Sequence, residues 1–198
     1  MSALIWKKNI LNYQRKDFMM WGNNMIEKGI GGGNTITGLN FENESNILSL
    51  LEKTDGYSVK DNVIYYKDKE VARSYAKHGL YKYLKKRGLD YQKYISKKLL
   101  PDEALYVIKN NTLFVIEIKF QKVAGSVDEK LQTCDFKKKQ YKKLMSPLNI
   151  DVEYIYILSD WFRDPTYKDT LDYIISVGCH YYFKYLPLEK IGLPVSKK

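Results

Sequence analysis

Two carboxylates and a lysine are the residues of this chain best suited to chemistry. Asp102 follows a proline, and Glu117-Ile118-Lys119 closes the next apolar run. Mg²⁺ prefers oxygen ligands and usually binds one or two carboxylates together with waters and a phosphate oxygen. A bound cation polarises a phosphate and lowers the pKa of a coordinated water, while an ammonium group orients that water or stabilises transition-state charge. Asp102, Glu117 and Lys119 are therefore candidates for metal-dependent phosphodiester hydrolysis.

The segment between the two acids predicts a β-hairpin. Residues 103–108 and 113–116 are rich in β-branched and aromatic side chains and flank an Asn-rich turn. Because asparagine tolerates positive φ, Asn110-Asn111 fits a two-residue type I′ turn, which would pair Asp102 with Lys119.

Strand alternation then decides which side chains share a face. Asp102, Glu117 and Lys119 would lie on one face, and Glu103 would point to the other. A longer turn would shift the pairing, and a one-residue slip would move Asp102 to the wrong face. An exposed hairpin with a solvated salt bridge is the alternative. Glu117 and Lys119, however, end a run as apolar as a central strand, where charged side chains are seldom buried without a function.

Pro101-Asp102 followed by Glu117-Ile118-Lys119 resembles the signature of the PD-(D/E)XK nuclease superfamily, which includes many type II restriction endonucleases and some junction resolvases. The resemblance covers residues 101–119 closely. The expected order of helix, hairpin, helix, strand, helix and strand is also similar to the α/β core of that superfamily. The resemblance implies Mg²⁺-dependent hydrolysis of DNA, with Mn²⁺ as a substitute cation and Asp102, Glu117 and Lys119 as the catalytic triad.

Two further residues are candidates near the metal. Members of the superfamily often add an acidic residue from a preceding helix, and a helix from about Leu39 to Lys53 would offer Glu42 or Glu44, of which we favour Glu42. A carboxylate at a helix start that interacts with the macrodipole is an equally good explanation. Gln121 would share the face of Lys119 if the strand continues, and is an accessory candidate for contacting water or phosphate.

A basic helix should follow the hairpin. Ser126-Val127-Asp128-Glu129 is a capping box and Pro147 ends the pattern, which predicts a helix over residues 127–145. Its lysines, together with the net charge of +10 and the pI near 9.3 of the whole chain, indicate a polyanionic partner. A solvated lysine face is the alternative. The lysines expected to contact the DNA backbone are Lys130, Lys138, Lys139, Lys142 and Lys143, and Lys137 belongs to the same basic helix.

The chain of 198 residues, 44% of them hydrophobic, fits one globular domain, and the expected elements form a mixed central β-sheet flanked by helices. The resemblance implies that this is a single nuclease domain with a restriction-endonuclease-like core. No segment approaches the roughly 20 apolar residues of a membrane span. Two cysteines, Cys134 and Cys179, are expected to be free thiols in the cytoplasm. The expected parts are a helical arm (1–28), a Gly-rich loop (29–38), the core (39–186, with strands 152–158 and 179–186 and a helix 165–177) and a loosely packed tail (187–198).

Three functions fit these observations. The favoured one is a type II restriction endonuclease that cuts double-stranded DNA, with a homodimer suggested by the symmetry of such targets. A junction-resolving or repair nuclease would use the same triad. A non-catalytic DNA-binding module on the same fold is the third. A zinc enzyme is not indicated, because neither His78 nor His180 has partners at zinc-ligand spacing.

Overall fold

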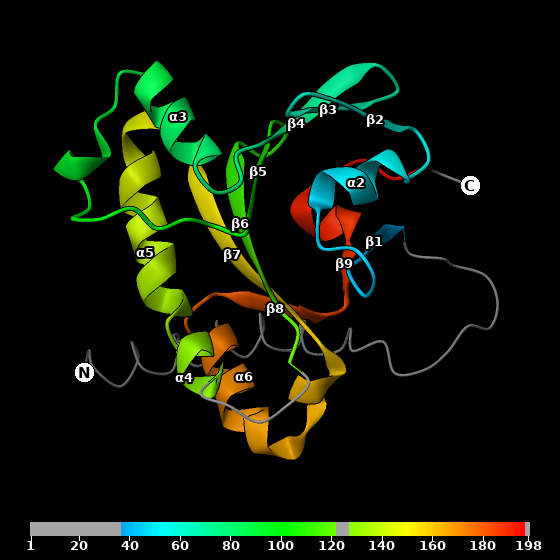
Figure 1. Ribbon diagram of the computed structural model, residues 1–198, viewed down its shortest axis with the longest axis vertical. Coiled ribbons are helices and arrows are strands. Elements are labelled where there is room, and N and C mark those ends of the chain that lie inside the picture. Colours follow the sequence, from blue (N-terminus) through cyan, green and yellow to red (C-terminus); the bar gives the residue numbers. More distant parts are fainter. Residues whose placement is uncertain (1–36, 122–126, 197–198) are drawn as a thin grey trace, which may run out of the picture. The chain divides into compact units, whose positions relative to one another are not determined.

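A mixed sheet of seven strands forms the centre of the protein (Figure 1). The computed structural model describes residues 37–121 and 127–196, which belong to one compact unit. The expected arm (1–28) and most of the Gly-rich loop lie outside the described residues. The predicted mixed α/β architecture is confirmed. In sheet order the strands are β2 (Tyr57–Lys60), β3 (Val63–Tyr66), β4 (Lys69–Ser74), β5 (Glu103–Val107), β6 (Thr112–Lys119), β7 (Asp151–Leu158) and β8 (His180–Phe183).

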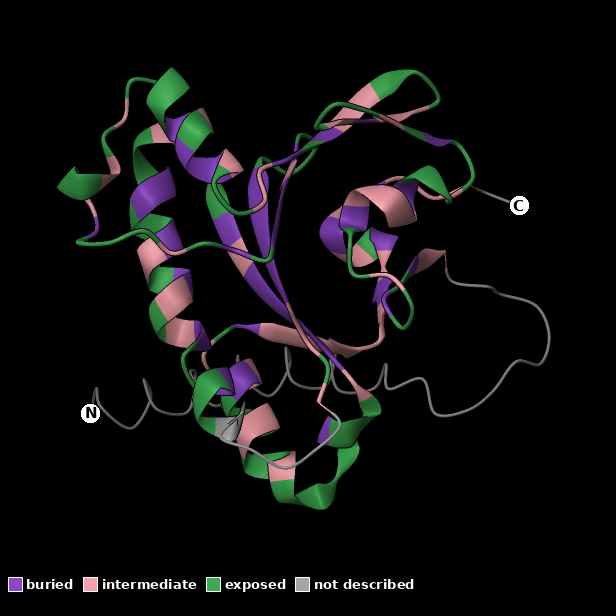
Figure 2. Ribbon diagram, in the orientation of Figure 1, coloured by how far each residue is buried: buried purple, intermediate pink, exposed green. Residues whose placement is uncertain are grey.

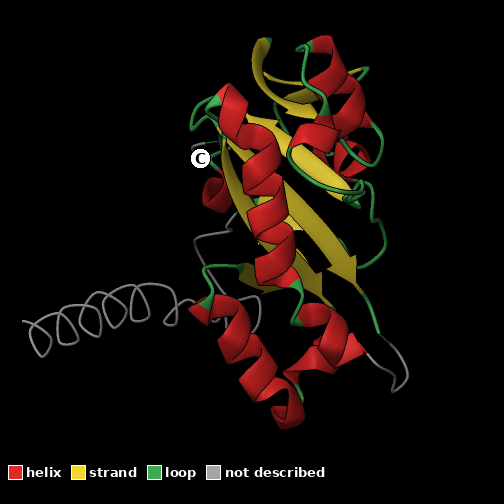
Figure 3. Cartoon of the chain, turned by 90° about the vertical axis from the view of Figure 1, so that its left-hand side faces the viewer, coloured by secondary structure: helices red, strands yellow, loops and turns green. Residues whose placement is uncertain are grey.

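Helices and a small second sheet cover the two faces of this central sheet (Figures 1 and 3). One face packs against α3, α5 and α6, and the other against α2, the β1–β9 pair and a 3-10 turn after β9. Strands β6 and β7 are covered on both faces and are buried over most of their length, as Figure 2 shows. Strands covered on both faces are typically apolar almost throughout, and these two are rich in apolar residues. The helices are α2 (Ile47–Glu52), α3 (Gly79–Lys86), α4 (Val127–Leu131), α5 (Cys134–Met145) and α6 (Lys168–Ser176), and the two short strands are β1 (Gly38–Asn40) and β9 (Tyr185–Pro187).

The β5–β6 hairpin differs from the sequence expectation in its turn. Val107 pairs with Thr112, so four residues connect the strands, and the prediction of a two-residue type I′ turn is wrong. Asn111 has a positive φ of 50° and is bound by groups outside the turn: its amide donates to the Asn149 carbonyl at 2.6 Å, and its side-chain oxygen accepts from Tyr106. These tertiary contacts favour the longer turn.

The register is consequently shifted by two residues. Glu103 lies opposite Ile116, so Asp102, just before the strand, is in line with Glu117 rather than with Lys119. An even shift leaves every side chain on its expected face. The predicted sharing of one face by the two acids and the lysine therefore holds in the structure.

The helix after the hairpin is interrupted. The expected continuous helix over 127–145 is two helices, α4 and α5, with a break at Gln132-Thr133. The Thr133 hydroxyl donates to the Lys130 carbonyl at 2.7 Å, a local bond that competes with helical backbone bonding. Downstream, strand β7 and the helix expected over 165–177 are present. The expected last strand is divided into β8 and β9 at Lys184, whose φ is 56°.

The region before the first helix also differs from expectation. A helix from Leu39 to Lys53 was expected, but α2 begins at Ile47, because Asn46 caps it by accepting from the Ser49 backbone N–H at 3.1 Å. Leu39 lies instead in β1, paired with Leu186 of β9. Glu42 and Glu44 consequently precede the helix rather than belong to it.

The C-terminal segment is well packed. Leu188, Ile191 and Leu193 are buried against the face covered by α2, and the Tyr57 hydroxyl donates to the Pro194 carbonyl at 2.5 Å. The expectation of a loosely packed tail over 187–198 is therefore wrong for the part of it that the structure describes. Among residues 37–121 and 127–196, no helix has the length and apolarity that crossing a bilayer requires.

Candidate active site

Glu117 is the buried centre of the candidate site. Strand alternation directs Leu113, Val115, Glu117 and Lys119 of β6 toward the face covered by α5. The Glu117 side chain retains 7% of its accessible surface, whereas that of Asp102 retains 50%. The site therefore has one enclosed carboxylate and one carboxylate open to solvent.

Lys119 joins the two acids. Its Nζ lies 3.2 Å from Asp102 Oδ2 and 3.0 Å from Glu117 Oε2. The backbone N–H of Ile118 also donates to Asp102 Oδ2 at 3.4 Å. Because one nitrogen contacts both carboxylates, the two acids lie within two hydrogen-bond lengths of each other. The structure thus brings together all three residues of the expected triad.

Asp102 is positioned by the segment that follows β4. The carbonyl of Pro101 accepts from the Lys77 backbone N–H at 3.0 Å, and the carbonyl of Ala104 accepts from Tyr75 N–H at 2.7 Å. These bonds on both sides of Asp102 hold its backbone at the start of β5, so that its side chain reaches β6.

A second lysine contacts Glu117 and was not among the expected site residues. Lys137 Nζ donates to Glu117 Oε1 at 2.7 Å and to Oε2 at 3.0 Å. The sequence does contain a signal for it, because Lys137 stands three residues after Cys134 and four before Tyr141, which are buried on the apolar stripe of α5. A lysine on such a stripe points toward the sheet rather than to solvent.

The charges of these groups stabilise one another. Burial alone would raise the pKa of Glu117, but the Lys119 and Lys137 ammonium groups outweigh burial and lower that pKa below its usual value. Burial would lower the pKa of Lys119, and the adjacent Glu117 and Asp102 carboxylates raise it instead. Glu117 is consequently an anion and Lys119 a cation at neutral pH.

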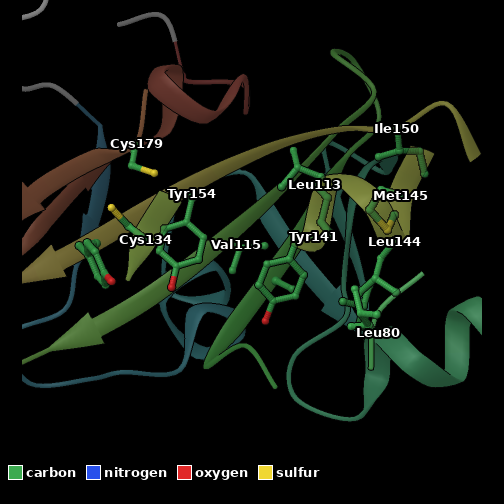
Figure 4. Packing of buried hydrophobic residues seen from close by; sticks show 14 of the residues in the cluster. Leu80, Leu113, Val115, Cys134, Tyr141, Leu144, Met145, Ile150, Tyr154 and Cys179 are labelled. Carbon is green, nitrogen blue, oxygen red and sulfur yellow. The ribbon is translucent and has the colours of Figure 1, made fainter. Parts of the chain in front are cut away.

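Tyrosines form the inner wall of the site. Tyr154 lies beside Tyr141 in the core between β7 and α5 (Figure 4), and its hydroxyl is buried with no hydrogen-bond partner among the described residues. Burial and the nearby Glu117 charge raise the pKa of Tyr154, so it keeps its proton.

The donor set suits a cation that needs few protein ligands. In the described part of the chain, no group of three or more His, Cys, Asp or Glu side chains gathers in a way that could hold a metal. Asp102 and Glu117 nevertheless provide the one or two carboxylates that Mg²⁺ uses when waters and substrate phosphates complete its shell. The chemistry of the site therefore fits Mg²⁺ held with the help of substrate rather than a closed all-protein cage.

Glu42 is not brought to this site. Its carboxylate pairs with Lys184 at 2.8 Å, and Lys184 also pairs with Asp160. Glu44 accepts from the Asn46 backbone N–H at 2.9 Å just before α2. Both acids belong to the segment that leads into α2, which covers the face of the sheet opposite to α5.

Glu103, the neighbour of Asp102, points to that opposite face, as expected from alternation. It is buried and accepts from the Ile47 backbone N–H at 3.4 Å at the start of α2. Burial raises the pKa of Glu103 to about 7. Two adjacent acids thus occupy different environments, and the one in the candidate site is Asp102.

Gln121 lies two residues beyond the end of β6. Its backbone N–H donates to Ser159 Oγ at 3.1 Å, and Ser159 Oγ donates back to the Gln121 carbonyl at 3.2 Å. The strand expected to align Gln121 with Lys119 ends before it, so its position is set by the β7 end rather than by strand alternation.

The basic helix contributes fewer exposed lysines than expected. Lys138 is 8% exposed, and its Nζ donates to Glu153 at 2.8 Å and to the Gly178 carbonyl at 2.5 Å. Its assignment to the DNA backbone is therefore wrong, because it follows Cys134 by four residues on the buried stripe. Lys139 pairs with Asp135 at 2.7 Å but remains exposed. The remaining expected contacts, Lys130, Lys142 and Lys143, are exposed.

No protein-family model matches this chain, and no curated protein or solved structure is similar to it at a significant level.

Proposed function

We propose that this protein is a Mg²⁺-dependent endodeoxyribonuclease of the PD-(D/E)XK type. The observation that carries the proposal is the Asp102–Lys119–Glu117 cluster, in which one ammonium nitrogen links an exposed and a buried carboxylate at the end of a central strand. Charged groups are rarely assembled in this way at a sheet centre for stability alone, because their desolvation offsets much of the gain.

The roles of the three residues follow from their positions. Asp102 and Glu117 would hold the cation, Glu117 as the enclosed ligand and Asp102 as the one nearer solvent. The cation supplies polarisation of the scissile phosphate and a more acidic bound water. Lys119, which contacts both acids, would orient the attacking water or stabilise charge on the pentacovalent transition state.

DNA is the proposed substrate because of the charge of the molecule. The net charge of +10 and the exposed lysines Lys139, Lys142 and Lys143 of α5 supply phosphate-binding groups on the same helix that carries Lys137 to the site. A type II restriction endonuclease, cytoplasmic and dimeric when it cuts both strands of a symmetric target, is the form of this activity that we favour.

Two nucleic-acid substrates test the proposal. Purified protein is incubated with supercoiled plasmid and with a four-way DNA junction, each with Mg²⁺, Mn²⁺ or EDTA, next to the Glu117→Gln variant. We expect discrete plasmid fragments with either cation and none with EDTA or with the variant. Selective cutting of the junction would indicate a resolving nuclease instead. DNA binding without cleavage of either substrate would mean that the protein is a non-catalytic binding module.

A further inference from the structure

Glu117 is held by two ammonium groups at once. Lys137 contacts both of its carboxylate oxygens, at 2.7 and 3.0 Å, and Lys119 contacts Oε2 at 3.0 Å. The side chain of Glu117 is almost fully enclosed, and each of its oxygens is already in contact with an ammonium group. A divalent cation that binds Glu117 must therefore replace at least one of them.

The two lysines are not equally able to leave. Lys119 is part of β6 itself and pairs with two acids, at 3.2 Å from Asp102 Oδ2 and 3.0 Å from Glu117 Oε2. Lys137 reaches the site from α5, and its ion pair among the described residues is with Glu117 alone. The two lysine side chains are almost equally exposed, at 27% and 25%, so the number of acids that each one contacts distinguishes them. A lysine has a flexible four-carbon stem, so Lys137 can swing toward solvent without a change in the backbone.

Charge balance also favours displacement of Lys137, rather than Lys119, by the cation. The two carboxylates and the two lysines together are neutral, and a divalent cation added to all four would place like charges at short range in a partly buried site. Departure of the Lys137 ammonium removes one of these like charges and opens Glu117 Oε1, while Oε2 keeps its contact with Lys119 at 3.0 Å.

We propose that Lys137 is a built-in competitor for the divalent cation: its ammonium group holds Glu117 until the cation displaces it. This inference rests on the proposed function, because it concerns the metal ligand Glu117. Lys137 is accordingly a positioning residue, which holds the Glu117 carboxylate in place and makes metal loading weaker than two carboxylates alone would give.

Calorimetric titration of the DNA-free protein with Mn²⁺ tests the exchange without any cleavage assay. We compare wild type with Lys137→Met, with Lys139→Met as the matched control, and with Glu117→Gln alone and combined with Lys137→Met. Lys139 lies on the same helix and its removal changes the net charge equally, but it pairs with Asp135. We expect Lys137→Met to bind Mn²⁺ at least fivefold more tightly than wild type, Lys139→Met to stay within twofold, and the gain to vanish in the Glu117→Gln background.

The outcomes separate this inference from the proposed function. If neither wild type nor Lys137→Met binds Mn²⁺, either alone or with an uncleavable DNA duplex whose phosphates can complete the metal shell, the metal centre itself is refuted. If wild type binds Mn²⁺ and Lys137→Met binds it no more tightly, the metal centre stands and the exchange is refuted. Equally tight Mn²⁺ binding by Lys139→Met would show that the effect comes from the change in net charge, and it would also refute the displacement of Lys137 by the cation.

A second measurement uses wild type alone and does not depend on the folding of a variant. The ¹⁵N resonance of the Lys137 ammonium group, protected by its ion pair, is followed during titration with Mg²⁺. We expect it to broaden into solvent exchange, while the resonance of Lys138, which is bound to Glu153 and Gly178 away from the site, stays unchanged. Persistence of the Lys137 signal at saturating Mg²⁺ would contradict the displacement of Lys137 from Glu117 by the cation.

Discussion

At the scale of single residues, chemically similar side chains that are adjacent in the sequence lie in different surroundings. Asp102 and Glu103 are both acids, yet Asp102 bonds Lys119 in the candidate site while Glu103 is enclosed at the start of α2. Lys137 and Lys138 are both lysines, yet Lys137 binds Glu117 and Lys138 binds Glu153. In each pair the backbone geometry of the strand or helix assigns the side chains to different surroundings.

Substitution of the triad tests the assignment to Asp102. Asp102→Asn, Glu117→Gln and Lys119→Ala should each reduce the cleavage rate by about 100-fold or more, because each would remove a proposed metal ligand or the charge proposed to stabilise the transition state. Glu103→Gln is the matched control and should cleave at the wild-type rate. The measurement is single-turnover cleavage of plasmid DNA, with circular dichroism to confirm folding. Normal cleavage by Asp102→Asn with loss in Glu103→Gln would reverse the assignment of the two acids.

Glu103 should also make stability depend on pH. Its folded-state pKa of about 7 lies above its ordinary value of 4.5, so folding favours the protonated form. The stability that comes from this proton is complete below pH 4.5 and is lost as pH rises through 7. Glu103→Gln keeps a neutral side chain at every pH. The unfolding free energy of the variant relative to wild type should therefore rise by about 2–3 kcal/mol between pH 5 and pH 8 in urea titrations. A constant difference across this range would show that Glu103 is not buried as described.

At the scale of elements, the hairpin and α5 determine the site together. The β5–β6 register places Asp102 in line with Glu117, and the stripe of α5 that carries Cys134 and Tyr141 places Lys137 over the same strand. The opposite face of α5 carries the exposed lysines. One helix thus contributes both to the buried site and to the basic surface.

The two faces of α5 should respond differently to the same substitution. Lys142→Gln with Lys143→Gln should weaken DNA binding regardless of sequence and reduce the slope of log K against log salt by about 0.9 for each lost phosphate contact, with little change in stability. Lys138→Gln should leave that slope unchanged and lower the unfolding free energy by about 2 kcal/mol, because it breaks charged hydrogen bonds to Glu153 and Gly178. Binding titrations at several salt concentrations and urea unfolding measure the two effects. An unchanged slope in the double variant would place that face away from DNA.

At the scale of the whole molecule, segments from near the start and the end of the described chain pack together on the face of the central sheet opposite to the site. Strand β1 pairs with β9, and the residues after β9 return to pack beside α2 and below Tyr57. This layer packs against β5 and β6 on the face opposite to the site, so the strands that carry the site are covered on both faces.

The packed C-terminal segment should matter for stability. Ile191 is fully buried, and Ile191→Ala should lower the unfolding free energy by about 2–5 kcal/mol through lost burial and a residual cavity. Glu189→Ala, two residues away and exposed, is the control and should change it by less than about 0.5 kcal/mol. Urea unfolding measures both. Equal, small effects would mean that the segment is as loosely packed as its sequence suggests.

The sequence by itself determined the elements and the faces around the triad. The apolar run before Glu117 predicted a central strand, and alternation placed Asp102 on the same face as Glu117 and Lys119 even though the turn was misjudged, because the error was an even number of residues. Strand β7 and the helix that ends near Val177 were readable in the same way, since periodicity and caps are local signals.

Tertiary structure alone decided the length of the β5–β6 turn, the partners of Lys137 and Lys138, and the packing of the C-terminal segment up to residue 196. Asn111 is held by Asn149, Glu42 by Lys184, and Lys138 by Glu153, all across large distances in sequence. The tail was misjudged because a short polar and apolar segment has no period of its own until β1 and α2 supply the surface on which it packs. Such contacts depend on where the chain returns in space, and no local pattern specifies that.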